Sequence, residues 1–375
     1  MTDVGKSKTK TAKGRNMSVS APLEHLSAEQ GQEFPSQEWK QVANPADHGL
    51  SADVRSKVDA ALEALPTTSF IAVAGGEILY SYGDISEVSY LASTRKSILS
   101  MLMGKAVAEG KIDLDLTMAD LGIDEDHGLL PIEKTATLRD LLISSSGVYH
   151  RPGSPGSNTK NIPERGSKKP GTYFHYNNWD FNVLGAAFEQ LTGRSVFKAF
   201  EEDFAGPMQM QDFDPSRQRM MGYEGASRYL AYHFFLSGRD MARLGLAMVR
   251  QGRWGDRQVM PTEWVAESTK IRVPAESMNE SEKSRIAGYS YLWWIPVVTD
   301  ETPEWQGACV AAGHFGQFIL CLPALDMVFV NRRAIPDHLA IARNDGSFKE
   351  ELPAVTMENF LGVADHFIRA KLTTG

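Results

Sequence analysis

The chain has 375 residues, of which 42% are hydrophobic and 23% are charged, and its formal net charge is -8. This length and composition predict a folded protein with a large core, built as one big domain or two interleaved lobes. The acidic balance argues against nucleic acid as a partner, and the sequence contains no run of 18 apolar residues that could span a bilayer.

The N-terminal segment differs in composition from the rest. Residues 1–20 carry five basic residues and no apolar segment, which excludes an ordinary secretory signal. We expect a disordered tail there, with a contact arm as the alternative, and an extended lead-in over residues 21–49. Residues 1–49 are therefore predicted to form a disordered or extended arm, residues 50–375 a single catalytic domain, and the protein is expected in the cytoplasm.

The front of this domain is predicted from capping and turn signals. Ser51 caps a helix over residues 51–65, and strands at 68–74 and 77–82 form a hairpin across a Gly-Gly turn. A buried helix then starts near Ser93 and stops at Gly110. A short helix over 137–142 has Thr137 as its cap. The next segment, 144–171, is a long loop rich in glycine and proline, a kind that often borders a site.

Helices are predicted in the middle of the chain and strands near its end. The helices cover residues 179–190 and 237–249, and Ser195 caps a further one. The strands cover residues 289–295, 308–312, 317–322 and 327–331, and a last helix covers 355–372. Cys309 and Cys321 lie in apolar stretches, which favours buried thiols over a disulfide between neighbouring strands.

Chain ends that build one antiparallel sheet around a helical insertion predict an α+β architecture of two lobes. The α/β lobe comprises residues 50–92 and 286–375, and the helical lobe comprises residues 93–285. A cleft between the lobes is the natural place for a site.

The pattern Ser-x-x-Lys occurs four times, at residues 7–10, 93–96, 157–160 and 195–198. Only Ser93 heads a buried helix. A serine and a lysine three residues apart share one helix face, so the amine of Lys96 can activate the Ser93 hydroxyl as a nucleophile. The alternative is that Ser93 only caps the helix and that Lys96 extends to solvent.

Three motifs in this order resemble the serine β-lactamase and penicillin-binding-protein superfamily, and the similarity covers about residues 51–372. They are Ser-x-x-Lys at Ser93, Tyr-x-Asn at Tyr176-Asn177-Asn178 and a basic-x-Gly motif at His314-Phe315-Gly316. The chain is most similar to the class C β-lactamase-like branch, which includes carboxylesterases and 6-aminohexanoate-dimer hydrolases. The resemblance implies a β-lactamase/transpeptidase-like fold, with an antiparallel sheet flanked by N- and C-terminal helices and an inserted, mainly helical lobe.

The resemblance also implies roles for the motif residues. Ser93 would be the nucleophile, and Lys96 and Tyr176 the bases that take and return its proton. Asn178 would orient Lys96 or the substrate. The backbone N–H groups of Ser93 and of Gln317, which follows Gly316, would form the oxyanion hole. Tyr173 is close in sequence, but Tyr176 alone is followed by asparagine two residues on.

The third motif departs from the Lys-Thr-Gly that β-lactamases and transpeptidases usually carry. His314 is neutral much of the time at pH 7, and Phe315 replaces the hydroxyl, which weakens recognition of an anionic β-lactam. A buried core histidine is an equal alternative for His314. Several aromatic residues could line a substrate pocket, although the core is the commoner location. They are Trp293 and Phe315, with Tyr149, Tyr229, Tyr232 and Trp294.

These observations predict a serine hydrolase that forms an acyl-enzyme on a small ester or amide, as a carboxylesterase or a nylon-oligomer-type amidase does. We expect no cofactor or metal, because the sequence has no HExxH, paired CxxC, P-loop or GxGxxG motif, and the absence of a GxSxG motif argues against an α/β-hydrolase. A homodimer is possible. The alternatives are a β-lactamase or D-amino-acid peptidase, and an inactive sensor or scaffold similar to penicillin-binding proteins.

Overall fold

The computed structural model describes residues 33–156, 161–223, 225–278, 285–348 and 352–374. The chain divides into two units, Met1–Gln32 and Glu33–Gly375. The predicted tail over residues 1–20 and the Ser-x-x-Lys matches at 7–10 and 157–160 lie outside the described residues. The second unit begins before residue 49, where the sequence predicts the boundary, and Gln41 already forms a parallel bridge with Ile78.

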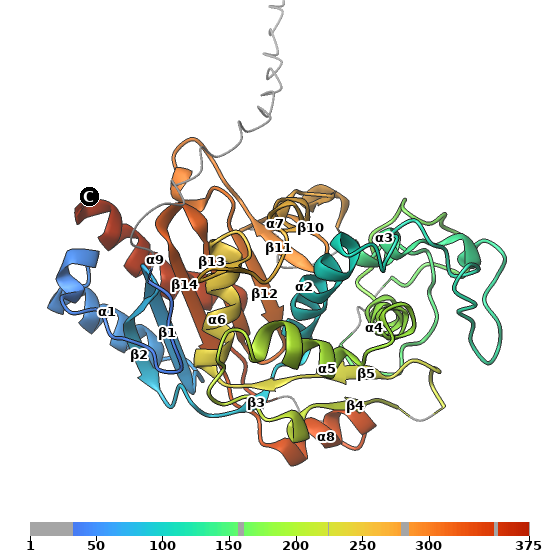
Figure 1. Cartoon of the computed structure of the whole chain (residues 1–375), viewed down its shortest axis with the longest axis horizontal. Coiled ribbons are helices and arrows are strands. Elements are labelled where there is room, and N and C mark those ends of the chain that lie inside the picture. The colour runs from blue at the N-terminus through green and yellow to red at the C-terminus, as the bar shows by residue number, and fades with distance from the viewer. Residues whose placement is uncertain (1–32, 157–160, 224, 279–284, 349–351, 375) are drawn as a thin grey trace, which may run out of the picture. The chain divides into compact units, whose positions relative to one another are not determined.

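An eight-stranded antiparallel sheet forms the centre of the second unit, with the strand order β2-β1-β14-β13-β12-β11-β10-β9 (Figure 1). Its strands are β1 (Ser69–Ala74), β2 (Glu77–Gly83), β9 (Val273–Pro274), β10 (Ile286–Ser290), β11 (Trp293–Pro296), β12 (Cys309–Gly313), β13 (Gln317–Leu322) and β14 (Met327–Arg332). Strand β1 pairs with β14, with Ser69 opposite Arg332, so both ends of the chain build one sheet.

Nine α-helices and three short ribbons surround this sheet within the described part of the chain. The helices are α1 (Ala52–Glu63), α2 (Arg95–Ala108), α3 (Leu138–Leu142), α4 (Asn178–Thr192), α5 (Val196–Phe200), α6 (Gly238–Val249), α7 (Thr262–Thr269), α8 (Asp337–Asp345) and α9 (Met357–Thr374). The ribbons pair β3 (Ser89–Tyr90) with β6 (Phe235–Leu236), β4 (Arg219–Met221) with β5 (Ala231–His233), and β7 (Arg253–Trp254) with β8 (Arg257–Gln258).

Both faces of the sheet are covered, because successive side chains of a strand point to opposite faces. Phe70 of β1 stacks on Phe367 of α9, with 6.0 Å between ring centroids, and α1 packs beside α9. The next residue, Ile71, belongs to the core on the other face, where α6 packs against β1, β13 and β14 (Figure 1). Helix α2 is buried next to this second core and carries the Ser93 motif at its N-terminal end.

The helices and the first hairpin are confirmed to within a few residues. Ser51 caps α1, Thr137 caps α3 in a capping box, and Ser195 caps α5. The single strand predicted over residues 289–295 is wrong, because β10 and β11 are separated by a turn at Tyr291 and Leu292, which both have positive φ. The proposed helical lobe of 93–285 is not wholly separate either, since α6 packs on the sheet and β9 is part of it.

Three further observations concern the cysteines, membrane-spanning helices and metal ligands. Cys309 and Cys321 lie opposite each other on β12 and β13, and both are free, buried thiols. None of the helices in the described ranges is both long and apolar enough to cross a bilayer. Among those same residues, no three His, Cys, Asp or Glu side chains are grouped to hold a metal ion.

Candidate active site

Ser93 lies in a tight turn just before α2. Residues Ala92–Thr94 form a single 3₁₀ turn, and Ala92 adopts a left-handed conformation with φ of 49°, which is costly for a residue with a Cβ atom. Oγ1 of Thr94 donates a hydrogen bond of 2.7 Å to the carbonyl oxygen of Gln317. This bond holds the turn against the first residue of β13, 223 residues further along the chain.

The side chains of Ser93, Lys96 and Tyr176 meet at the N-terminal end of α2. Nζ of Lys96 lies 2.9 Å from Oγ of Ser93 and 2.6 Å from the hydroxyl oxygen of Tyr176. Ser93 and Tyr176 are half-buried, whereas Lys96 is only 2% exposed. Tyr173, the other tyrosine nearby, lies beside Lys168 instead. The three predicted residues therefore share one hydrogen-bonded group.

The backbone on both sides of Tyr176 is fixed by the loop that precedes it. The N–H of His175 donates to the carbonyl of Ser144, and Oγ of Ser144 donates to the carbonyl of His175. Asn177 is the N-cap of α4: its side chain accepts from the N–H of Trp179 and donates to the carbonyl of Val148 at 3.1 Å. Tyr176 is consequently positioned by rigid neighbours and not by its own contacts alone.

The surroundings of Lys96 favour a neutral amine. Its Nζ atom lies 4.2 Å from the ring centroid of Tyr176 and 4.3 Å from that of Phe181. Burial, followed by the charge of Arg95, holds the pKa of Lys96 well below its ordinary value of 10.5. A neutral amine can accept a proton from a hydroxyl that it touches, so this geometry allows Lys96 to act as a base.

The alternative role for the first motif is wrong. Thr94 is the N-cap of α2 and makes no side-chain capping hydrogen bond, and Ser93 contacts Lys96 instead. Lys96 is buried and does not extend to solvent.

The third motif forms the tight turn between β12 and β13. Phe315 and Gly316 have φ of 71° and 105°, and a Cβ atom at Gly316 would lie 2.6 Å from Cβ of Val355. Glycine is thus required at 316 both for its backbone conformation and for space. Nδ2 of Asn331 donates to the carbonyl of Gly316 at 2.7 Å and fixes this turn. The sequence analysis did not identify Asn331.

Strand β12 closely approaches the Ser93 turn at Gly313. A Cβ atom at this position would lie 2.4 Å from the carbonyl oxygen of Leu91 and 2.8 Å from Oγ1 of Thr94. Because glycine has no side chain, the tip of the β12–β13 hairpin can lie directly against the Ser93 turn. The backbone segments of Ser93 and Gln317, which are the predicted oxyanion-hole donors, are side by side as a result.

His314 is exposed, so the buried core alternative for this residue is wrong. The surrounding atoms nevertheless desolvate its ring, and together with the charge of Arg343 they lower its pKa to about 4. His314 is therefore neutral at pH 7. Phe315 is buried in a small cluster beneath it and is not a pocket-lining side chain.

The remaining predicted site residues fall in different places. Asn178 is buried at the start of α4, where its amide donates to the carbonyl of Pro155. Trp293 is 1% exposed and lies in the core, whereas Trp294, on the other face of β11, contacts Tyr176 with 5.8 Å between ring centroids. Strand alternation explains why Trp294, and not Trp293, reaches the site.

The other aromatic candidates lie away from the Ser93 group. Tyr149 packs edge-on against His175, and Tyr229 bonds the backbone of Asp124. Tyr232 is fully buried under Arg95. These three side chains pack the surroundings of the site.

The family of the chain follows from a comparison with family models. The β-lactamase family model matches residues 54–331, which span the Ser93 motif, Tyr176 and the β12–β13 hairpin. The chain belongs to the β-lactamase family. None of the curated proteins compared with the chain matches it.

The chain is also similar to solved structures of proteins that are named as different kinds of hydrolase. A protein from Bacillus anthracis, provisionally named a 6-aminohexanoate-dimer hydrolase, is 19% identical with a TM-score of 0.60, over 91% of this chain and 89% of that one. A family VIII carboxylesterase is 15% identical with a TM-score of 0.58, over 90% and 99%. A β-lactamase from Mycobacterium bovis is 18% identical with a TM-score of 0.51, over 77% and 97%. At these identities the likeness shows the fold and not the substrate.

Proposed function

We propose that this member of the β-lactamase family is a serine hydrolase that forms an acyl-enzyme on Ser93 with a small ester or amide. The observation that carries the proposal is the position of one buried amine, Lys96 Nζ, at 2.9 Å from the Ser93 hydroxyl and 2.6 Å from that of Tyr176. A serine with an adjacent base and a second proton carrier has the parts that acyl transfer needs.

The chemistry proceeds in two halves. In acylation, Ser93 gives its proton to Lys96 while Oγ attacks the substrate carbonyl, and the backbone N–H groups of Ser93 and Gln317 stabilise the oxyanion. Lys96 passes the proton through Tyr176 to the leaving alcohol or amine as the bond to it breaks. In deacylation, a water molecule gives a proton back along this path and attacks the acyl carbonyl, and Ser93 leaves with its proton restored.

The third motif supports an uncharged substrate over a β-lactam. At pH 7 His314 carries no positive charge, because its pKa is lowered to about 4, and Phe315 offers no hydroxyl. Tyr176 and Trp294 add a partly exposed aromatic surface beside the Ser93 group. An apolar acyl or alcohol group fits such a surface better than a carboxylate does. The name of one structural neighbour, a family VIII carboxylesterase, agrees with this substrate class.

The test compares the wild type with Ser93→Ala. We expect a fluorophosphonate probe to label Ser93, and Ser93→Ala to lose both the labelling and the hydrolysis of a short p-nitrophenyl ester while remaining folded. Loss of activity should be at least about 10³-fold. A panel of esters, linear amides and nitrocefin then ranks the substrate classes.

Two other results of these assays would favour a different function. Nitrocefin turnover as fast as ester turnover would indicate a β-lactamase or a D-amino-acid peptidase. A folded wild-type protein that neither reacts with the probe nor hydrolyses any member of the panel would indicate a sensor or scaffold.

A further inference from the structure

Arg95, next to Lys96 in the first turn of α2, is a buried charge without a carboxylate partner in the described part of the chain. It is 2% exposed, and its Nη2 donates to Oδ1 of Asn182 at 3.0 Å. Its guanidinium carbon lies 4.5 Å from the ring centroid of Tyr232. Its Nη1 is buried without a well-aligned hydrogen bond among those residues, and the neighbouring polar group is the hydroxyl of Tyr232.

This arrangement is energetically costly, which makes a functional reason worth seeking. Burying an unpaired charge is expensive, and a guanidinium cannot escape the cost by losing its proton under ordinary conditions. A neighbouring amine can do so. When two cationic groups share a buried space, the arginine stays charged and the lysine is driven to its neutral form.

The elements packed against this end of α2 offer no opposing charge in the residues that the structure describes. On β5, His233 is fully buried, and burial, Arg95 and Lys96 keep its pKa well below the ordinary value, so it is neutral. Tyr232 on the same strand is also buried, and burial raises the pKa of its hydroxyl. Asp180, in the first turn of α4, accepts from Ser146 and has a raised pKa because of burial.

Other groups around α2 are paired elsewhere or are too remote. His314, at the tip of the β12–β13 hairpin, is neutral at pH 7. At the far end of α2, Lys105 bonds Asp203 of the turn after α5. Glu263 and Glu267 of α7 line a cavity of about 620 Å³ at that same far end, beside Gly104 and Val107. Burial is the larger cause of the lowered pKa of Lys96, and Arg95 is the charged group that adds to it.

We propose that Arg95 is a positioning residue of this hydrolase, whose unneutralised charge adds to the effect of burial in keeping the Lys96 amine unprotonated and ready to take the Ser93 proton. The inference rests on the proposed function, because it assigns Lys96 the role of base. It adds that Arg95, which no carboxylate neutralises in the described part of the chain, favours the unprotonated form of Lys96.

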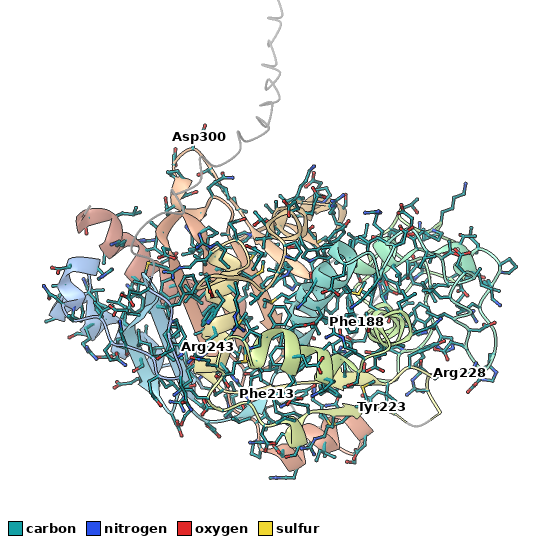
Figure 2. All side chains as sticks on the ribbon, in the orientation of Figure 1. Phe188, Phe213, Tyr223, Arg228, Arg243 and Asp300 are labelled. Atoms are coloured by element: carbon teal, nitrogen blue, oxygen red, sulfur yellow. The ribbon has the colours of Figure 1, made fainter. Side chains whose placement is uncertain are left out.

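Three variants separate charge from packing. Arg95→Met removes the charge and keeps much of the side-chain length, and Arg95→Lys puts in its place a buried amine that can itself lose its proton. Asn182→Asp leaves Arg95 in place and sets a carboxylate against it, at the cost of the bonds that Nδ2 of Asn182 makes to Ser154 and Tyr229. The matched control is Arg243→Met, because Arg243 is equally buried but lies on α6, where Figure 2 labels it.

The measurements are kcat/KM for a p-nitrophenyl ester and the rate of Ser93 labelling by a fluorophosphonate, each from pH 5 to pH 10. We expect both rates to fall on the acidic side as Lys96 becomes protonated. In Arg95→Met and Asn182→Asp this acidic limb should move to higher pH. The resulting loss at pH 7 should be roughly tenfold or more and should largely disappear at high pH.

Arg95→Lys should move the acidic limb to higher pH, because a buried amine at position 95 can lose its proton and then no longer disfavours the protonated form of Lys96. Arg243→Met should leave the acidic limb in place even if that variant is less stable. A merely structural role for Arg95 would lower the rates equally at every pH. Such a uniform loss, or an unmoved acidic limb in folded Arg95→Met and Asn182→Asp, overturns the inference. If Arg95→Met does not fold, Asn182→Asp decides the question.

Failure of the proposed function gives a different result. In that case the wild-type protein itself shows neither ester hydrolysis nor labelling of Ser93 at any pH. If the wild type is active and the acidic limb does not move, only the role of Arg95 is refuted.

Discussion

Helices α2 and α6 both start with a serine followed two residues later by an arginine, but these side chains have different kinds of partner in the two helices. Helix α6 starts with Ser237-Gly238-Arg239-Asp240, where Ser237 is the N-cap, and its serine, arginine and aspartate side chains are all paired within the protein. Oγ of Ser237 accepts the N–H of Asp240 at 3.1 Å, as an N-cap does. Arg239 donates two hydrogen bonds of 2.6 Å to Asp212.

The sequence Ser93-Thr94-Arg95-Lys96 covers the start of α2, which begins at Arg95, and the same kinds of groups have different partners there. Ser93 does not cap the helix, and Arg95 meets an amide and an aromatic ring where Arg239 meets a carboxylate. A paired group stabilises a fold, whereas an unpaired one stores electrostatic energy that chemistry can use. A serine and an arginine at the start of a helix therefore do not by themselves indicate a reactive site. What distinguishes the reactive helix start from the structural one is whether these side chains are paired.

The two fully buried arginines on these helices make the same point. Arg243 of α6 donates to the carbonyls of Met208 at 2.8 Å and Gln37 at 2.9 Å and lies 3.9 Å from Asp240 (Figure 2). Burial lowers the pKa of Arg243 to about 10, so it remains charged at pH 7. Its charge is balanced by a carboxylate on the same helix, which Arg95 lacks within the described residues.

The largest effect should come from Lys96→Met. Methionine fills a similar volume without an amine, so we expect kcat/KM for an ester to fall by roughly 10³-fold, with little change in the free energy of unfolding. In the wild type, kcat/KM should rise with pH as the amine loses its proton at its lowered pKa, and this rise should vanish in the variant.

The control on the other helix is Ser237→Ala. Loss of the α6 cap should cost about 1 kcal/mol of unfolding free energy in denaturant and leave kcat/KM unchanged. If Ser237→Ala instead lowers kcat/KM as much as Lys96→Met does, the contrast between the two helices is broken.

A smaller loss of rate is expected for Tyr176→Phe. The ring still packs on Trp294 and Phe181, but the hydroxyl that lies 2.6 Å from Lys96 is gone. We expect kcat to fall by about 10²-fold or more, because proton transfer to the leaving group loses its carrier. Single-turnover kinetics with an ester and an amide measure this loss. Full activity in the variant would remove Tyr176 from the proton path.

A last prediction concerns the pH dependence of stability at α6. Burial raises the pKa of Asp240 from its ordinary value of 3.8 to about 6, so the folded state holds this proton more tightly than the unfolded state does. The associated stabilisation is complete below about pH 4 and is lost as the pH rises through 6. Asp240→Asn does not titrate, so between pH 4 and pH 7 its unfolding free energy should gain roughly 2 kcal/mol relative to the wild type.

Urea unfolding at pH 4, 5.5 and 7 measures this difference. The variant also loses an acceptor for the N–H of Gln211 or Asp212, which adds an offset that does not change with pH. A difference that is constant across the three pH values would mean that the Asp240 carboxylate is ionised throughout, as a partner of Arg243.

Local signals in the sequence predicted most of the elements. Ser51 and Thr137 cap helices because their side chains accept nearby N–H groups, and the Gly-Gly turn of the first hairpin is signalled by two residues that readily adopt positive φ. The turn at Tyr291 and Leu292 was missed because neither residue type signals positive φ. Two long-range hydrogen bonds hold it: Ser97 Oγ to the Leu292 carbonyl, and the Leu292 N–H to the Leu142 carbonyl.

The residues of the candidate site also differ in whether a local sequence pattern could predict them. Helical spacing alone predicted that Ser93 and Lys96 meet, whereas Tyr176 came from the family resemblance, because 80 residues separate it from Lys96. Asn331 and Arg95 were not predicted as contributors. Their contacts with Gly316 and Asn182 involve residues distant in sequence, and no local pattern specifies those contacts.

The hydrogen bond from Thr94 to Gln317 has a consequence for biosynthesis. It joins segments 223 residues apart, and β13, which Gln317 begins, is held between β12 and β14. During translation the ribosome must release almost the whole chain before this strand can find its neighbours. A nascent or truncated polypeptide would carry Ser93 and Lys96 but lack the facing backbone, so hydrolytic power should arise abruptly, at the end of folding.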